Sequence, residues 1–366
     1  MVEQQIQNEF QPDYVISPGD VLSYELDIRG MTQQELSKRT GLTPKHIVAV
    51  IKGKASITPG SALKLERATG MPVEYWLNLE SQYQELHARK AEEEQLERDS
   101  DWLKKIPLAK MSKLGWLEKY KDKKEQLVEV LRFFGIAKVE QWDDMWPSLN
   151  VAYRQHNTHE VFPEAVSAWL RQGELEAAGI ECEPYDKTAF RGCLDKIRSL
   201  TAKSPEEFVP EMQALCASAG VAVVFVPALP KTGVSGATRW LNSNKAVIQL
   251  SLRYKTNDHL WFTFFHEVGH ILLHGKKEVF LEGNNCNGLD EVKENEANVF
   301  SENELIPRKL FTKFIVFGSY SKASILNFAK DVGIAPGIVV GQLQHRKLLS
   351  YKQCNDLKKI FKWVHE

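Results

Sequence analysis

The HExxH pentapeptide at residues 266–270 most restricts how this chain can fold, because it lies in a strongly apolar run that predicts a helix over residues 258–273. At 3.6 residues per turn, His266 and His270 lie on one face about one turn apart, which lets two imidazoles reach one zinc ion. Burying two imidazoles and the carboxylate of Glu267 among apolar neighbours is costly unless a partner satisfies them. The pattern therefore predicts a buried metal site on a helix.

Glu267 lies beside the face that carries the two histidines. A carboxylate there can take a proton from a water molecule as it attacks a peptide carbonyl, and can then pass that proton to the leaving amine. We therefore expect a zinc-dependent metallopeptidase with His266 and His270 as ligands and Glu267 as general base. The alternative is a chance match, with histidines that are only structural.

A catalytic zinc ion needs a third protein ligand and an open position. The longer pattern HExxHxxGxxH is absent, because Leu273 and Lys276 stand where glycine and histidine would be needed, and no histidine occurs between His274 and His345. The third ligand should therefore be a downstream carboxylate. The candidates are Glu278, Glu282, Asp290, Glu291, Glu294, Glu296, Glu302 and Glu304.

Helical spacing selects among these carboxylates. Val292, Glu296 and Phe300 follow one another at intervals of four residues, which places Glu296 in an apolar stripe. Glu294 shares its face with the polar Asn298 instead. We predict Glu296 as the third ligand, with Glu294 as the next candidate. The alternative for Glu296 is a buried carboxylate paired with an arginine or a backbone amide.

Two further side chains near the motif have weaker claims. His274 lies two turns past His266, too far to join the same metal ion, so we expect it to support the site or the fold. Cys286 lies in a loop rich in asparagine and glycine, between the two helices that carry the candidate ligands. It is either an ordinary loop cysteine or a thiolate that reaches the zinc ion and keeps the enzyme inactive.

The residues around the motif resemble the ImmA/IrrE family of metallopeptidases over roughly residues 205–310. The resemblance rests on the segments Phe264–His274, Glu296–Ser301 and Leu305–Pro307, which occur in the order typical of that family. It implies a small helical zinc protease with a short sheet, whose substrates are helix-turn-helix repressors. The family pattern has alanine at the position of Ser301, a conservative difference.

The N-terminal part predicts a helix-turn-helix. Residues 32–40 read as one short helix that ends at Gly41, and Thr43 begins a second that runs to Ile51. Thr32 and Glu35 form the pattern of a capping box. Apolar residues in both helices would hold them at a steep angle, as in DNA-binding proteins.

A local excess of positive charge supports this interpretation. Residues 36–65 contain five lysines and one arginine but no acidic residue, although the whole chain has a net charge of −1. We expect Thr43, Lys45 and His46 to meet base edges at the start of the second helix, and Lys52 and Lys54 to hold phosphates. The alternative is a protein-binding module with a solvated basic face.

Residues 16–83 resemble the HigA-type antitoxins of the Xre repressor class. The resemblance rests on Ser17–Leu22 ahead of the helix-turn-helix, and on Ile57–Gly70 and Trp76–Leu79 after it. It implies a homodimer that binds operator DNA, and a small toxin as a further partner. Fusion to a protease domain leaves the antitoxin role open.

Length and composition divide the chain. At 366 residues it exceeds one ordinary core. We expect a helix-turn-helix domain at 1–83, a helical linker region at 84–200 with a charged stretch at its start, and a zincin-like metallopeptidase domain at 201–366. The fold class is mainly α, with a small α+β C-terminal domain built on strands near Val221–Val226 and Ala246–Leu250.

The five cysteines are scattered, with no CxxC spacing, and neither a signal peptide nor an apolar run long enough for a membrane span is present. These features predict a cytoplasmic protein without a membrane partner. We expect a regulator that cleaves a helix-turn-helix repressor or antitoxin, in cis or in trans. The alternative is a transcriptional repressor or antitoxin whose zinc domain senses or scaffolds and cleaves nothing.

Overall fold

The computed structural model describes residues 16–146, 162–275, 280–283 and 291–363. The chain divides into two compact units, Met1–Ser100 and Asp101–Glu366. The charged stretch where we expected the linker region to begin continues the last helix of the first unit, because α5 runs without a break from Val73 to Asp99.

The first unit is entirely helical in its described part. Its helices are α1 (Pro18–Ile28), α2 (Gln33–Thr40), α3 (Pro44–Ile51), α4 (Pro59–Thr69) and α5 (Val73–Asp99). Gly41 has φ +69° and turns the chain between α2 and α3. Leu36, Ile47 and Trp76 are buried in one core. The predicted helix, glycine turn and second helix are therefore confirmed.

The second unit begins with helices that lead to the sheet. They are the 3-10 helix η1 (Ser100–Lys105), α6 (Leu108–Lys113), α7 (Lys123–Phe134), α8 (Glu140–Met145), α10 (Pro163–Ala178), α11 (Lys187–Ser199), the 3-10 helix η2 (Leu200–Ala202) and α12 (Pro205–Ala217). Trp102 in η1 lies against Phe134 in α7, with ring centroids 5.9 Å apart. Aromatic packing thus joins the start of this unit to α7, its first long helix.

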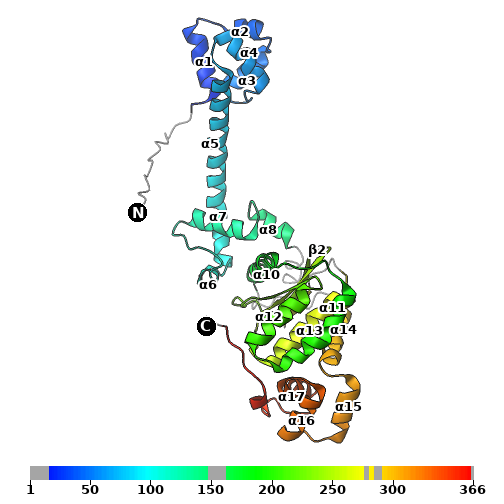
Figure 1. The fold of residues 1–366 in the computed structure, drawn as a ribbon. Coiled ribbons are helices and arrows are strands. Elements are labelled where there is room, and N and C mark those ends of the chain that lie inside the picture. The colour runs from blue at the N-terminus through cyan, green and yellow to red at the C-terminus, as the bar shows by residue number, and fades with distance from the viewer. Residues whose placement is uncertain (1–15, 147–161, 276–279, 284–290, 364–366) are drawn as a thin grey trace, which may run out of the picture. The chain divides into compact units, whose positions relative to one another are not determined.

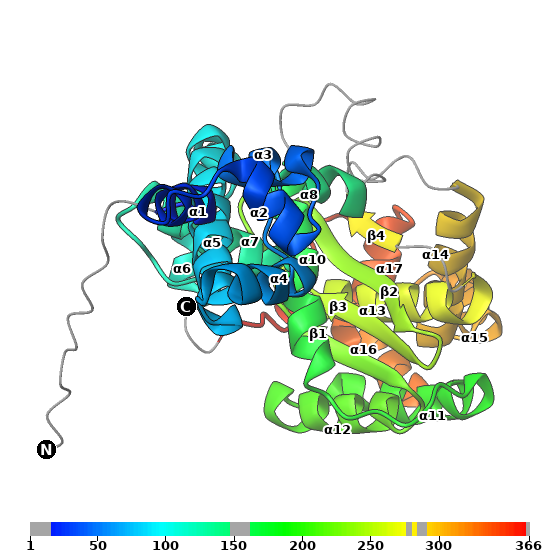
Figure 2. The ribbon, with the colours of Figure 1, turned by 90° about the horizontal axis from the view of Figure 1, so that it is seen from above.

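A four-stranded sheet follows, with the strand order β1-β3-β2-β4 (Figure 2). The strands are β1 (Val221–Phe225), β2 (Val234–Asn242), β3 (Lys245–Leu250) and β4 (Phe280–Gly283). β1 and β3 agree with the two strands predicted. β2 was missed, because Gly233 and Gly236 made its first half resemble a loop.

Helices cover both faces of the sheet, with α10 on one side and α13 (Asn257–Leu273) on the other (Figure 1). Buried polar groups tie α10 to its face: Arg239 of β2 donates to the Leu170 carbonyl at 2.7 Å, and Gln249 of β3 donates to the Trp169 carbonyl at 2.6 Å. On the other face, Thr238 of β2 donates to the Glu267 carbonyl at 3.2 Å. The sheet therefore directly supports the helix that carries the HExxH motif.

The remaining elements pack around α13. They are α14 (Glu291–Leu305), α15 (Arg308–Phe317), α16 (Lys322–Val332), α17 (Pro336–His345) and the 3-10 helix η3 (Asn355–Leu357). α17 fits closely against the start of α13, since a Cβ on Gly337 would lie 2.5 Å from the Asn257 side chain. The mainly helical fold with a short C-terminal sheet is confirmed.

Within the described residues, no single helix has the length and apolar character to cross a membrane, although α16 and α17, bent by 113°, pass that test as a pair by length and composition.

Candidate metal centre

Helix α13 holds the HExxH motif inside the core. Trp261, Phe264 and Phe265 bury their rings completely around it. His266, Glu267 and His270 are themselves only 1%, 0% and 2% exposed. Ionisable side chains are seldom buried to this extent without a partner. The burial expected from the sequence is therefore real, and the motif must be satisfied from inside the protein.

Helix α14 lies close against α13 because the residues between them are small. A Cβ added to Gly269 would lie 3.1 Å from the Ala297 Cα. Ser301 is buried and donates a hydrogen bond to the Phe262 carbonyl at 2.8 Å. The buried face of α14 consists of Ala297, Ser301 and Leu305, and this face decides which carboxylate reaches the histidines.

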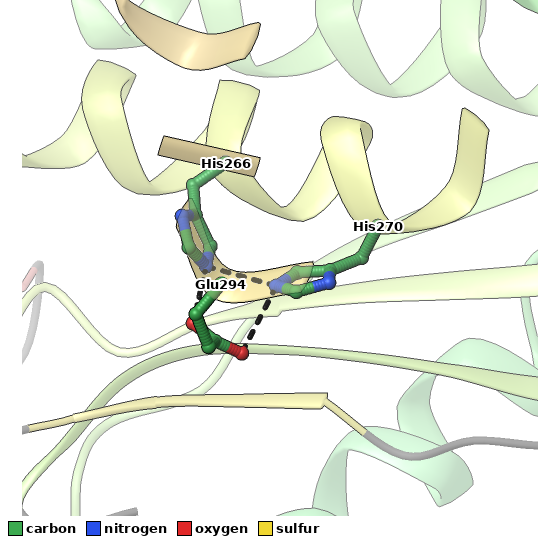
Figure 3. A group of neighbouring side chains, drawn as sticks. All are labelled: His266, His270 and Glu294. Atoms are coloured by element: carbon green, nitrogen blue, oxygen red, sulfur yellow. Dashed lines mark hydrogen bonds and ion pairs between the residues drawn. The ribbon is translucent and has the colours of Figure 1, made fainter. Parts of the chain in front are cut away.

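Glu294 brings its carboxylate to both histidines of the motif. Its Oε2 lies 3.2 Å from His266 Nε2, and its Oε1 lies 3.4 Å from His270 Nε2. The two Nε2 atoms are 2.9 Å apart. Figure 3 shows the two imidazoles and the carboxylate pointing toward one another. Among the residues that the structure describes, this is the only cluster of three or more potential metal-binding side chains.

The prediction of Glu296 as third ligand therefore needs correction. Glu296 contacts His274 instead, at 3.1 Å, and its side chain is 54% exposed. The apolar stripe used to select it begins outside the core, since Val292 is 65% exposed. The helical phase was wrong because the buried face of α14 follows Ala297, Ser301 and Leu305, and not Val292 and Phe300. Glu294, the second candidate, occupies the position instead.

Hydrogen bonds on the outer side of each ring fit neutral imidazoles protonated on Nδ1 in both candidate ligands. Asn298 Oδ1 lies 3.0 Å from His266 Nδ1, so this nitrogen donates. His274 Nε2 lies 3.1 Å from a carboxylate oxygen of Glu296 and donates to it, which makes His274 Nδ1 an acceptor. His270 Nδ1, 2.9 Å from His274 Nδ1, is then a donor. Each ligand histidine thus carries its proton on Nδ1 and its lone pair on Nε2.

The resulting donor set suits a divalent cation. Burial lowers the pKa of His270 to about 2, with the neighbouring His266, His274 and Lys293 adding to the shift, so this ring is neutral. Two ring nitrogens and a carboxylate converge within 3.4 Å. Two imidazoles and one carboxylate are a ligand set of catalytic zinc sites. The residues present therefore fit a zinc ion.

Glu267 lies on the side of α13 that faces β2. A Cβ on Gly236 would lie 2.7 Å from Glu267 Oε1 and 2.5 Å from the Thr263 methyl carbon. Only glycine allows the strand to approach this carboxylate so closely. This close approach explains why a glycine occurs inside β2, a requirement that the sequence alone did not reveal.

The residues predicted to bind DNA all lie in or beside α3. Thr43 caps the helix by accepting a hydrogen bond from the His46 amide at 3.2 Å. Thr43 and Lys45 are exposed and His46 is half-buried at the start of α3, whereas Lys52 and Lys54 are exposed just beyond its end. The predicted base-reading and phosphate-binding groups thus lie at opposite ends of one short helix.

Comparison with known proteins agrees with a division into an N-terminal helix-turn-helix and a C-terminal part that carries the HExxH motif. Residues 24–76 match the helix-turn-helix family, and residues 216–340 match the M78 peptidases, described as an IrrE N-terminal-like domain. The uncharacterized HTH-type transcriptional regulator YddM of Escherichia coli (strain K12) is 30% identical over 73 residues, or 20% of this chain and 78% of that protein. The chain belongs to the Xre-type helix-turn-helix regulators and carries an IrrE/ImmA-like peptidase domain.

Two solved structures are also similar to part of this regulator. An addiction module antidote protein of a HigA family from Coxiella burnetii is 31% identical, with 23% of this chain and 94% of that chain covered and a TM-score of 0.22. A protein described as an antidote of a plasmid maintenance system from Nostoc punctiforme is 30% identical, with 23% and 91% covered and a TM-score of 0.22.

The two family resemblances found in the sequence are therefore confirmed. The protein is a helix-turn-helix DNA-binding regulator fused to an M78 peptidase domain of the metallopeptidase type. Cys286, the alternative ligand, lies outside the described residues.

Proposed function

We propose that this regulator is a zinc-dependent endopeptidase that cleaves a helix-turn-helix repressor or antitoxin, in cis or in trans, to control gene expression. The observation that carries the proposal is that Glu294 of α14 meets His266 and His270 of α13, the helix that also carries Glu267. A bound zinc ion would act as a Lewis acid and lower the pKa of a water molecule.

The protein's own residues would divide the remaining work. His266 and His270 offer Nε2 lone pairs because Asn298 and His274 engage the opposite nitrogens. Glu294 supplies the negative charge of the ligand set. Glu267 would accept the proton of the attacking water and return it to the leaving amine, because it is the acidic side chain next to the first ligand on the same helix.

Glu296 and His274 would act as positioning residues. Hydrogen bonds run from Glu296 to His274 and on to His270, at 3.1 and 2.9 Å, and hold the His270 ring with Nε2 toward Glu294. Metal-binding histidines usually donate their second nitrogen in this way, which fixes the tautomer and raises ligand basicity. The carboxylate that we first predicted as a ligand therefore has a supporting role.

The proposed substrate class follows from the fusion of the two domains. A peptidase linked to a DNA-binding domain affects transcription most directly if it removes a DNA-binding protein, either its own N-terminal unit or a separate repressor. The resemblance to ImmA/IrrE peptidases supports the same class. We expect the protein to act as a homodimer, to bind operator DNA, and to have zinc as its metal.

The test uses full-length protein loaded with zinc, alone and mixed with helix-turn-helix repressors encoded by neighbouring genes. Mass spectrometry of the products should show one defined cut, and Glu267→Gln should retain zinc but leave every protein intact. A cut that persists in Glu267→Gln would contradict the proposed base.

The alternative is a repressor or antitoxin that cleaves nothing and uses its zinc domain as a sensor or scaffold. It predicts that zinc removal changes DNA binding or toxin binding while no product forms. This alternative would therefore be favoured over the peptidase if none of the tested proteins is cleaved and if the affinity for operator DNA depends on zinc.

A further inference from the structure

A second basic region lies outside the helix-turn-helix. Residues 104–124, here called the lysine segment, contain eight lysines and two acidic residues, a net charge of +6 in a chain whose total is −1. The basic stretch at 36–65 carries the same net charge of +6. The second unit therefore opens with as much local positive charge as the predicted DNA-binding region.

The fold turns these lysines outward. Apolar residues between them, Ile106, Met111 and Leu117, are buried. Six of the eight lysines are exposed and two are half-buried. The exposed lysines are Lys104, Lys105, Lys113, Lys119, Lys121 and Lys123. Interleaving of this kind places the charges on the outer surface of a packed helical layer.

The segment has a defined shape. Gln126 of α7 accepts a hydrogen bond from the Tyr120 amide at 3.0 Å and donates one to the Glu118 carbonyl at 3.2 Å. Asp122 caps α7 by accepting from the amides of Lys124 and Glu125, at 2.7 and 3.1 Å. These bonds hold the backbone around Lys119, Lys121 and Lys123 against α7, so the lysines lie on a structured surface.

Few of these charges are neutralised within the protein. Asp122 is engaged as a helix cap, and Glu118 accepts a hydrogen bond from the Tyr120 hydroxyl at 3.0 Å. Lys104 pairs with Asp101 at 2.7 Å and Lys105 with Glu164 at 3.6 Å. Within the described parts of the chain, no ion pair is formed by Lys110, Lys113, Lys119, Lys121 or Lys123. The surface therefore retains a large positive charge for a partner.

We propose that the lysine segment binds the phosphate backbone of DNA without reading its sequence. Its charge is complementary to a polyanion, and lysine ammonium groups bind phosphates as point charges. The segment contains no arginine, asparagine or glutamine, the side chains that most often read base edges by paired hydrogen bonds. It therefore adds affinity and not sequence preference.

DNA is the favoured occupant because of the covalent connection. The segment begins at Lys104, shortly after the end of α5 at Asp99, and α5 is a 27-residue helix that belongs to the helix-turn-helix unit. Once that unit has bound DNA, the tether raises the effective concentration of nearby phosphates around the segment. An acidic protein would meet the same charges without this advantage, so DNA is the stronger expectation.

The experiment uses full-length protein and a labelled 40-base-pair duplex of scrambled sequence, with affinity measured over a salt series. Lys119, Lys121 and Lys123 are changed together to glutamine, which leaves the buried contacts intact. Each lost phosphate contact should lower the slope of log affinity against log salt by about 0.9. The triple variant should therefore show a reduced slope and weaker binding to every duplex, while its thermal unfolding stays unchanged.

A matched control changes three exposed lysines of the C-terminal helices and tail, Lys309, Lys330 and Lys352, to glutamine. It lowers the net charge equally and should leave the slope unchanged. Equal slopes for wild type and the 119/121/123 variant would overturn the proposal, and so would an equal loss in the control. Binding of the same proteins to poly-glutamate is measured in parallel. If the 119/121/123 variant loses affinity for poly-glutamate but not for DNA, the segment serves an acidic protein instead and the DNA proposal is wrong.

Discussion

Helices α13 and α14 together form the candidate metal centre, yet they are buried to very different extents. In α13, 14 of 17 residues are buried, whereas in α14 only 3 of 15 are. In α13, a polar side chain of the motif is inside the core whichever way it points from the helix axis. In α14, only one narrow face is inside. A ligand on α14 can therefore be identified only when that face is known.

Two neighbouring carboxylates of α14 show the consequence. Glu294 and Glu296 are two residues apart, which turns them about 200° from each other around the helix axis. Glu294 reaches His266 and His270 with a side chain that is 31% exposed, while the 54% exposed Glu296 reaches only His274. A shift of two positions thus separates a candidate ligand from a supporting residue.

The largest expected effect on zinc affinity comes from replacing each of these two carboxylates separately with alanine. Glu294→Ala should weaken zinc binding by well over 100-fold, because it removes one of three ligands, and His266→Ala should do the same. Glu296→Ala is the comparison variant and should lose less, about 10–100-fold, because it removes only the partner of His274. Competition with a chromophoric chelator measures both affinities. An equal loss in the two glutamate variants would break the distinction between them.

The next effect concerns the support of His270. His274→Ala and Glu296→Ala should each weaken zinc binding by about 10–100-fold, the usual cost of losing the partner of a metal-binding histidine. Both changes act on one chain of hydrogen bonds, so the double variant should lose little more than either single one. Additive losses would show that the two residues act separately.

A smaller effect is expected where the helices touch. Gly269→Ala should lower the free energy of unfolding by about 1–2 kcal/mol, because its Cβ would lie 3.1 Å from the backbone of Ala297. Gly192→Ala in α11, where no atom lies within 4 Å of the added carbon, is the control and should stabilise the protein by roughly 0.5–1 kcal/mol. Urea unfolding measures both, and a stabilised Gly269→Ala protein would contradict the close packing.

The smallest effect belongs to Ser301. Ser301→Ala removes the hydrogen bond to the Phe262 carbonyl but keeps a small side chain between the helices. It should cost about 1 kcal/mol in the free energy of unfolding and leave zinc affinity unchanged. A change in zinc affinity would show that this hydroxyl, and not only the small size of the residue, sets the position of Glu294.

Several features of the molecule could be predicted from local sequence. The helix over residues 257–273 follows from its apolar run, and the turn between α2 and α3 follows from Gly41. β2 could not be predicted, because Gly236 weakens the strand pattern and its reason lies in a contact with Thr263 and Glu267. Local propensity cannot report a contact between segments that lie far apart in the chain.

The sequence by itself determined the division of labour: a basic helix-turn-helix at one end, and at the other a buried helix whose two histidines face the same way. Only the tertiary structure decided the third member of the metal group. The choice between Glu294 and Glu296 depends on which face of α14 meets α13, and that face is set by Gly269, Ala297 and Ser301. Small residues give no hydrophobic signal along a chain, yet they let two helices approach closely enough to bring a carboxylate to two imidazoles.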